Sequence, residues 1–325
     1  MEVADLWFSD GTIVVRAEEK LFRLHGGLLA ACSPVFKAII EHENNASQIH
    51  GVDIGSDLTG LTLITIQEVS GNDAHNFFLA IYDPGFFEAP PATASINCVL
   101  GILKMATKFR VKALRRRALA HLNLTFPLTL EEWDERATLS TLSFRRDANT
   151  STPFQSTFES AIAIVNTAEK VDAQWIKPAA IYECCTYDPD HFLVNPVWND
   201  GVTISEELKK TIIMGAFAHR NATRIVLKFL VSPPCKECEQ PQECLEVKRG
   251  CNEHHATNFP LSSPLSIWED GDWEGFLDGL CQPCEAQCWE QHSHARHAVR
   301  KELPKEYGLE ESWGVLQEKY SMEMF

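Results

Sequence analysis

Seven of the eleven cysteines in this chain of 325 residues lie between Cys235 and Cys288. They include two C-x-x-C pairs, Cys235 with Cys238 and Cys281 with Cys284, which 42 residues separate. A two-residue spacer lets both thiolates of a pair bind one ion, and two pairs complete a tetrahedral shell of four sulfurs. Such a shell favours zinc, with iron–sulfur chemistry as an alternative. The spacing therefore predicts a zinc site at Cys235, Cys238, Cys281 and Cys284, against the simpler interpretation that these are buried free thiols.

The remaining cysteines of this segment could form a second site. Its candidate ligands are Cys244, Cys251, Cys288 and one histidine from among His254, His255 and His292. Cys288 and His292 are four residues apart, which places both on one face of a helix. Cys288 also follows Cys284 by four residues, so it could join the first site instead. The ligand partition stays open, as does the interpretation of this second set as buried thiols.

A zinc ion in a four-thiolate shell is expected to be structural. Catalytic zinc keeps an open coordination position, which four thiolates would fill. Few long apolar runs occur between Cys235 and Cys288, so the energy of metal binding would be folding energy. Neither C-x-x-C pair has a thioredoxin-like βαβ context, and the chain contains no P-loop, G-x-G-x-x-G, H-E-x-x-H or G-x-S-x-G motif. We expect a protein that is not an enzyme.

The charge of the chain limits its partners. The net charge is −16, and residues 233–325 alone carry −10, from 8 basic and 18 acidic residues. An acidic segment repels phosphate backbones, which argues against nucleic acid as a partner. No apolar run approaches the ~18 residues needed to cross a bilayer, and the first residues carry no signal region. We therefore expect an intracellular protein, cytoplasmic or nuclear, that is neither secreted nor bound to a membrane and keeps its thiols reduced.

The first 127 residues alternate strand-like and helix-like segments. Asp10-Gly11 stands between two strand-like runs and predicts a hairpin turn. Ser33 is placed to cap a helix that begins with Pro34. Apolar residues recur at helical spacing over residues 96–122, which predicts two helices joined near Arg110-Val111. This mixture predicts an α+β fold.

Two further regions follow. Residues 128–232 show a mostly helical pattern, and Thr129-Leu130-Glu131-Glu132 fits a capping box at the first of these helices. Residues 233–325 hold the cysteines and end in a helix-like tail. The chain is thus predicted to contain three parts: residues 1–127, a helical extension over 128–232, and a Cys-rich, zinc-stapled region over 233–325.

A series of short motifs runs through residues 5–126 in a fixed order. The motifs are Asp5, Phe8-Ser9-Asp10-Gly11, Phe22-Arg23-Leu24-His25, Ser33-Pro34-Val35-Phe36, and Leu103-Lys104-Met105-Ala106-Thr107-Lys108-Phe109. Together they resemble a BTB/POZ domain, especially those of the expanded fungal (basidiomycete-type) family. Residues 159–185, with Trp175-Ile176-Lys177-Pro178, resemble the helical continuation of the same fungal proteins.

This resemblance implies a small mixed sheet flanked by helical hairpins, and a domain that binds other proteins. BTB domains form homomeric or heteromeric contacts, and some recruit cullin-type ubiquitin ligases, which implies an adaptor role. The contact would be an apolar patch near the first strand and first helix, with Leu6, Trp7 and Phe8 as candidates, unless these residues belong to the core.

The resemblance also marks Asp5, Phe8, His25, Ser33 and Phe36 as motif residues. BTB domains often centre a charged pocket on an acidic and a basic residue, and Asp5 stands at the acidic position. Gly26-Gly27 follows His25 where a basic residue is usual. The alternative is that Asp5 caps the opening segment and that His25 is a hydrogen-bonded, buried residue.

Two other functions compete with a non-enzymatic interaction protein. One is a zinc-dependent, nucleic-acid-binding transcription regulator, which would need clustered basic residues, whereas the Cys-rich region holds only isolated adjacent pairs, Lys248-Arg249 and Arg300-Lys301. The other is a metalloenzyme, which thiolate-rich ligation and the lack of a general-base motif disfavour.

Overall fold

The computed structural model describes residues 1–41, 52–56, 60–139, 142–143, 157–199, 203–258, 261–266, 273–275 and 279–324. The chain forms two compact units, which we describe separately. Unit 1 consists of Met1–Gln155, Thr167–Ile176 and Glu323–Phe325, and unit 2 consists of Ser156–Asn166 and Lys177–Met322.

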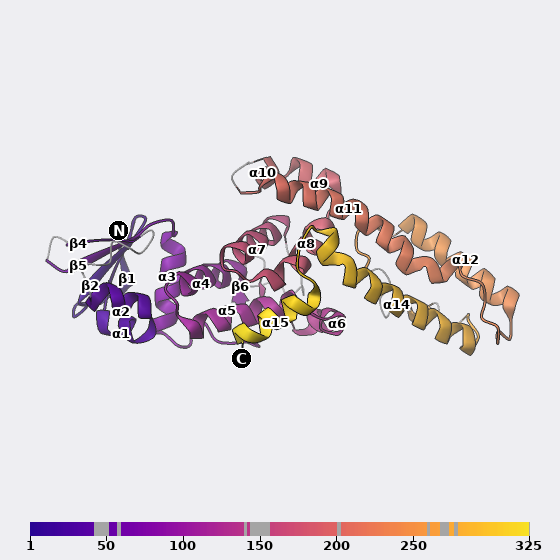
Figure 1. Ribbon diagram of the computed structural model, residues 1–325, viewed down its shortest axis with the longest axis horizontal. Coiled ribbons are helices and arrows are strands. Elements are labelled where there is room, and N and C mark those ends of the chain that lie inside the picture. Colours follow the sequence, from indigo (N-terminus) through magenta and orange to yellow (C-terminus); the bar gives the residue numbers. More distant parts are fainter. Residues whose placement is uncertain are drawn as a thin grey trace. The chain divides into compact units, whose positions relative to one another are not determined.

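Unit 1 begins with a mixed five-stranded sheet (Figure 1). The strands are β1 (Glu2–Trp7), β2 (Ile13–Ala17), β3 (Lys20–Leu24), β4 (Val52–Ser56) and β5 (Thr62–Ile66). Their order across the sheet is β1-β3-β2-β5-β4, in which β2 pairs antiparallel with β3 and parallel with β5. Val15 lies opposite both Phe22 and Ile64, and all three side chains are fully buried. The β-branched and aromatic residues of the sequence therefore form the centre of the sheet.

The prediction of a hairpin at Asp10-Gly11 is wrong. β1 pairs in parallel with β3, and β3 lies between β1 and β2, so the chain crosses here from one side of β3 to the other. The Gly11 amide donates to the Phe8 carbonyl (3.0 Å), and a Cβ atom at Gly11 would lie 2.8 Å from Cγ of Arg23. The dipeptide correctly marks a tight turn, but a turn signal does not specify which strands pair.

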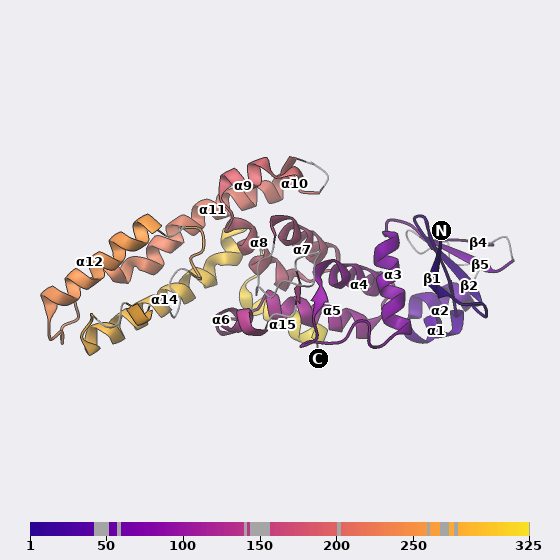
Figure 2. The same cartoon turned by 180° about the vertical axis from the view of Figure 1, so that it is seen from behind.

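Helices follow the strands in unit 1. They are α1 (Gly26–Cys32), α2 (Pro34–Glu41), α3 (Gly71–Tyr82), α4 (Ile96–Lys108), α5 (Lys112–Thr125) and α6 (Leu130–Leu139), with a 3-10 turn, η2 (Gln174–Ile176). A short strand, β6 (Ala94–Ser95), pairs with β7 (Leu142–Ser143). Helix α3 packs on α4, and α4 packs on α5 (Figure 2).

Three local predictions in unit 1 are confirmed. The two helices over residues 96–122 meet at Arg110, whose φ of 53° breaks the helix. The Phe36 amide donates to Oγ of Ser33 (3.0 Å), which caps α2. Thr129 and Glu132 form the reciprocal capping box, because each backbone amide donates to the other residue's side chain at 3.1 Å.

An aromatic cluster forms the core of unit 1. Phe22 of β3, Phe36 of α2, Phe77 and Phe78 of α3, and Phe109 after α4 are all fully buried. The rings of Phe36 and Phe109 stack with centroids 4.3 Å apart, and the Ser33 hydroxyl donates to the Phe109 carbonyl. The cluster joins the sheet to the helices through rings from separate parts of the sequence.

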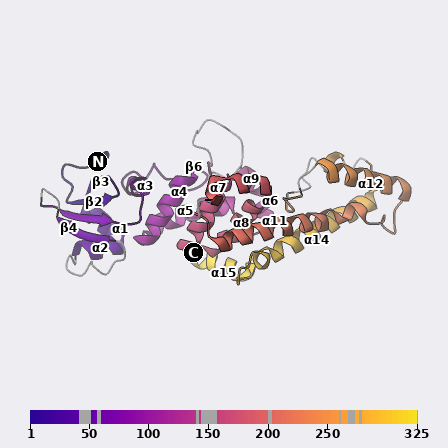
Figure 3. The ribbon, with the colours of Figure 1, turned by 90° about the horizontal axis from the view of Figure 1, so that it is seen from above.

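Unit 2 is helical in the residues that the structure describes. Its elements are α8 (Lys177–Cys185), α9 (Pro189–Val194), α10 (Pro196–Asn199), α11 (Glu206–Val226), η3 (Leu227–Val231), α12 (Pro241–Asn258), α14 (Gln282–Glu306) and α15 (Trp313–Met324), and α7 (Phe158–Lys170) begins in it. Helix α11 packs against α8 and α14 (Figure 3).

A buried histidine of α11 forms hydrogen bonds with two other segments of unit 2. His219 of α11 donates through Nδ1 to the Ser262 carbonyl (2.7 Å) and accepts at Nε2 from the Tyr307 hydroxyl (2.7 Å). Burial lowers the pKa of His219 to about 4, so the ring is neutral. The ring of Tyr182 of α8 packs at a tilt against this ring, with centroids 4.5 Å apart, and its hydroxyl accepts a hydrogen bond from the Leu265 amide (2.9 Å).

The predicted fold class is confirmed. The chain has an N-terminal mixed sheet with helices, a mostly helical remainder and a cysteine cluster. The three-part division at residues 127 and 232 stays a prediction. Of the helices that the structure describes, none combines the length and apolar character needed to span a membrane.

Candidate metal centre and the motif residues of unit 1

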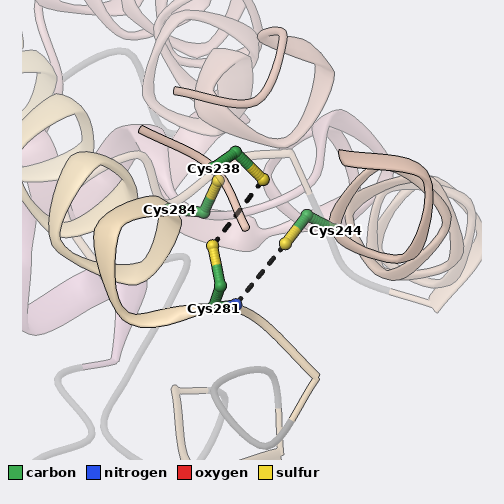
Figure 4. Close-up of side chains that lie close together, drawn as sticks. All are labelled: Cys238, Cys244, Cys281 and Cys284. Carbon is green, nitrogen blue, oxygen red and sulfur yellow. Dashed lines mark hydrogen bonds between the residues drawn. The ribbon is translucent and has the colours of Figure 1, made fainter. Parts of the chain in front are cut away.

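Four cysteine side chains of unit 2 converge on one point (Figure 4). The sulfur atoms of Cys238, Cys244, Cys281 and Cys284 all lie within 4.8 Å of one another. Three of these residues are buried, and Cys238 is half-buried. We call these four residues the thiol group. Its donor set could hold a metal ion and is compatible with zinc.

Two helix N-termini bring these thiols together. Cys281 is the N-cap residue of α14, and Cys284 lies in the first turn of that helix. Cys244 lies in the first turn of α12, which begins at Pro241. The partial positive charge at a helix N-terminus stabilises thiolates, which are the form that binds metal.

A close approach between chain segments positions the second cysteine pair. A Cβ atom at Gly279 would lie 2.6 Å from Cγ2 of Val247 on α12, so a residue with a side chain would displace this segment. Pro283 then lies within the first turn of α14, where its missing amide proton leaves no donor unsatisfied. The close approach at Gly279 therefore places the segment just before Cys281 against α12.

One sulfur separation in the thiol group matches the edge of a metal–thiolate tetrahedron. Within the thiol group, the Sγ atoms of Cys281 and Cys238 are 3.7 Å apart. A zinc ion with Zn–S bonds of about 2.3 Å requires edges of about 3.8 Å between sulfurs. The Cys281 amide also donates to Sγ of Cys244 (3.4 Å). Hydrogen bonds of this kind compensate the charge of a ligating thiolate.

Burial and hydrogen bonding act in opposite directions on the acidity of the thiols. Burial raises the pKa of Cys284 to about 12, and it also raises the pKa values of Cys238 and Cys244. In Cys281 burial acts in the same direction. There, hydrogen bonds from the backbone of Glu239 and Cys284 and from neighbouring thiols outweigh it and lower the pKa to about 6. Without metal, the thiol group thus carries one thiolate at neutral pH.

Three of the four ligands predicted for the first site belong to the thiol group. The fourth, Cys235, lies beside Cys284, and Cys244 completes the group in its place. Cys244 comes from the set predicted for a second site, and its signal in the sequence is the short distance from Cys238. The sequence alone could not separate these two candidates, because both precede α12 or lie at its start. The ligand partition stays a prediction.

The other candidates for a second site do not gather into a metal-binding group among the described residues. Cys288 is buried on α14. Burial raises the pKa of its thiol, and the charge of nearby Lys248 offsets only part of this rise. His292 is buried against the rings of Phe229 and Trp273, and burial lowers its pKa to about 3. Cys251 is half-buried on α12, and the side chain of His255 lies outside the described residues.

The motif residues of unit 1 fall into two sets. Ser33 and Phe36 are in the core and join α2 to Phe109, as described above. Phe8 is half-buried and stacks on Tyr82 of α3, with ring centroids 4.8 Å apart. Next to it, Nε2 of His25 lies 3.2 Å from Oδ1 of Asp10, and the His25 amide donates to the Tyr82 hydroxyl (2.7 Å). His25 is therefore hydrogen-bonded, but it is only partly buried.

Asp5 pairs with a histidine of α3. Its carboxylate Oδ2 lies 2.8 Å from Nε2 of His75 on α3. His75 and Tyr82 were not predicted as site residues, because both lie on α3, far along the chain from the residues they contact. Their signal would have been a histidine and a tyrosine at the two ends of one short amphipathic helix.

Comparison with known protein families supports this arrangement. Residues 5–124 match the BTB/POZ domain. This part of the chain is a BTB/POZ domain. Its match ends at the close of α5, so it covers the sheet and the helices that enclose the aromatic core. A search of curated proteins finds no match to the chain.

The BTB domain is an interaction domain, not a catalytic one. Of the three residues considered for its contact patch, Leu6 is fully buried and belongs to the core, whereas Trp7 and Phe8 are half-buried. Strand β1 lies at an edge of the sheet. Leu28 of the adjacent α1 leaves 38% of its surface exposed. An edge strand with apolar neighbours is a surface on which another chain can dock.

Proposed function

We propose that this protein is a non-enzymatic interaction module that associates through its BTB domain with a second copy of itself or with another BTB domain. The match of residues 5–124 to that domain carries the proposal. The edge position of β1 and the exposed Leu28 of α1 support a contact near the first strand and first helix. Burying such apolar surface against an equivalent patch is a common basis of symmetric dimers.

The oligomeric state of the full chain tests this contact. We expect light scattering to show a dimer at tens of micromolar, and we expect Leu28→Glu to shift it toward a monomer. The matched control is Leu245→Glu on α12, because Leu245 is exposed to a similar extent (40%) but lies in unit 2. A monomeric wild-type chain, or equal effects of the two substitutions, would contradict the proposed contact.

A structural zinc ion in unit 2 forms the second part of the proposal. Cys238, Cys244, Cys281 and Cys284 would be its ligands, supported by their mutual distances and by two helix N-termini directed at them. We expect one zinc ion per chain in elemental analysis of protein purified without chelator. Protein that is folded and dimeric but free of metal would remove the metal from the proposal and leave the BTB association intact.

An adaptor role toward a cullin-type ubiquitin ligase is a finer proposal, supported only by the association of some BTB domains with such scaffolds. Binding of the full chain to a purified cullin-type protein tests it, with Leu28→Glu compared in parallel. Membership of the expanded fungal (basidiomycete-type) group is proposed on the resemblance of residues 159–185. An intracellular location is supported by the eleven free thiols.

The alternative of a zinc-dependent nucleic-acid-binding regulator gains no support from the site. Lys248, on the same helix as Cys244, is fully buried and cannot face a phosphate backbone. A nucleic-acid interface needs exposed, clustered cations that face the phosphates. Retention on DNA-cellulose with a steep salt dependence would revive this alternative.

A further inference from the structure

One lysine of unit 2 is buried where a charge is least expected. Lys248 lies on α12, and none of its surface is exposed to solvent. A lysine is almost never fully buried unless an anion or several acceptors compensate its charge. The groups around the Lys248 ammonium should therefore include its compensating anion or acceptors.

The hydrogen bonds of Lys248 do not supply that charge. Its ammonium donates to Oγ of Ser232 (3.0 Å) and to the Ser232 carbonyl (3.3 Å), which are both neutral acceptors. Within the described part of the chain, no carboxylate forms an ion pair with it. Cys288 on α14 lies close enough to Lys248 that the lysine charge opposes the rise that burial causes in the pKa of this thiol.

The position of Lys248 relates it to the thiol group. Lys248 follows Cys244 by one helical turn on α12, and Cys288 follows Cys284 by one turn on α14. Residues four apart lie on the same face of a helix. Lys248 and Cys288 thus form a second layer, one helical turn beyond the layer of Cys244 and Cys284.

A metal in the thiol group would provide the missing anion. Four thiolates and one divalent ion carry a net charge of about −2, and this charge would be buried with the sulfurs. We propose that Lys248 is the buried counter-charge of the metal–thiolate group and increases its affinity for metal. This inference rests on the proposed metal site, which it deepens. Lys248 would act as a positioning residue that contacts no metal itself.

Zinc affinity of the full chain, measured by competition with a chromophoric chelator, tests this role. We expect Lys248→Met and Lys248→Gln to weaken zinc binding about 10- to 100-fold, the usual cost of losing a partner outside the ligand shell. The matched control is Lys236→Gln, which removes the same charge from an exposed residue within the first C-x-x-C pair. It should change the affinity less than about twofold, because solvent screens an exposed charge.

Lys248→Gln and Ser232→Ala separate charge from hydrogen bonding. Glutamine can still donate to Ser232 but carries no charge, whereas Ser232→Ala removes the side-chain acceptor and keeps the charge. Full zinc affinity in Lys248→Gln, or a loss in Ser232→Ala equal to that in Lys248→Met, would overturn the inference. A wild-type chain that binds no zinc would instead refute the proposed metal site itself, so the two failures are distinguishable.

Discussion

Metal binding to the thiol group should release about three protons, and this number follows from the unequal acidities of its cysteines. Cys281 has a pKa of about 6, so at pH 7.5 it is about 97% thiolate. Burial raises the pKa values of Cys238, Cys244 and Cys284, which keeps these three thiols protonated. All four must be thiolates in the metal complex. One ion therefore displaces about three protons.

The size of the pH effect follows directly. With about three protons released, zinc affinity rises about a thousandfold for each unit of pH between 7 and 8, or ~4 kcal/mol. Calorimetry in two buffers of different ionisation enthalpy measures the number of protons, since the observed heat depends linearly on it. Zinc would be delivered from a weak chelator, so that tight binding remains measurable.

Two substitutions should give different proton counts. Cys281→Ser removes the ligand that is already ionised, so the weakened site should still release about three protons. Cys244→Ser removes a protonated ligand, so release should fall to about two. Cys98→Ser in unit 1 is the control and should change neither affinity nor proton release, because Cys98 lies outside the thiol group.

The same experiment distinguishes the two possible ligand sets. If the four residues of the C-x-x-C pairs bind the metal, Cys244→Ser should leave the release at about three, and Cys235→Ser should weaken binding instead. A wild-type release of about four protons, or equal counts for Cys281→Ser and Cys244→Ser, would refute the reasoning from the acidities.

Two further predictions concern stability. The pKa of His219 is about 4 in the folded chain, below its ordinary value of 6.5, so the unfolded chain binds the proton more readily. The stability that neutral His219 contributes is therefore lost as the pH falls from about 6.5 toward 4. Urea unfolding should show that His219→Gln reduces the loss of stability between pH 8 and pH 5 by about 2 kcal/mol, whereas exposed His297→Gln should not. Gly101→Ala should destabilise unit 1 by about 1–3 kcal/mol, because its Cβ would lie 3.2 Å from Cα of Asp73. Gly250→Ala, where nothing lies within 4 Å, should instead be stabilising by up to about 1 kcal/mol, and thermal melting of both variants checks this.

Local signals predicted the boundaries of several elements because their physical causes are local. Ser33 before Pro34, the break at Arg110 and the box at Thr129 all depend on hydrogen bonds within a few residues, and each is found as predicted. The order of strands has no such local cause. The turn at Asp10-Gly11 was recognised, but the insertion of β3 between β1 and β2 depends on pairing between distant strands.

The candidate site shows the same division. The two C-x-x-C pairs were evident in the sequence because the two-residue spacer sets their geometry. The placement of Cys244 rather than Cys235 within the thiol group depends on how α12 begins and how closely Gly279 approaches Val247. Lys248 was not recognised, because a lysine next to an arginine on a polar helix is typical of a solvated surface. Only the burial of its side chain shows otherwise.

The scarcity of buried apolar side chains on α12 indicates that a metal ion would stabilise this part of unit 2. Over residues 241–254 only Cys244 and Lys248 are buried and Val247 is half-buried, so this helix contributes little buried hydrocarbon surface there. Burial of apolar surface, which stabilises most helices against their neighbours, is thus nearly absent for these residues. A bound ion would replace it, because the energy of metal binding then becomes folding energy.

Hydrogen exchange of the full chain with and without chelator tests this dependence. The backbone amides of α12 should lose protection when zinc is removed, while those of α11 keep theirs, because α11 is anchored by buried Leu208, Ile212 and Val226. The BTB domain serves as the internal control, since its core contains no thiol-group residue. Equal protection of α12 in both states would show that the polar helix is held by contacts other than the metal, and the thiol group would then be an ordinary cluster of buried cysteines.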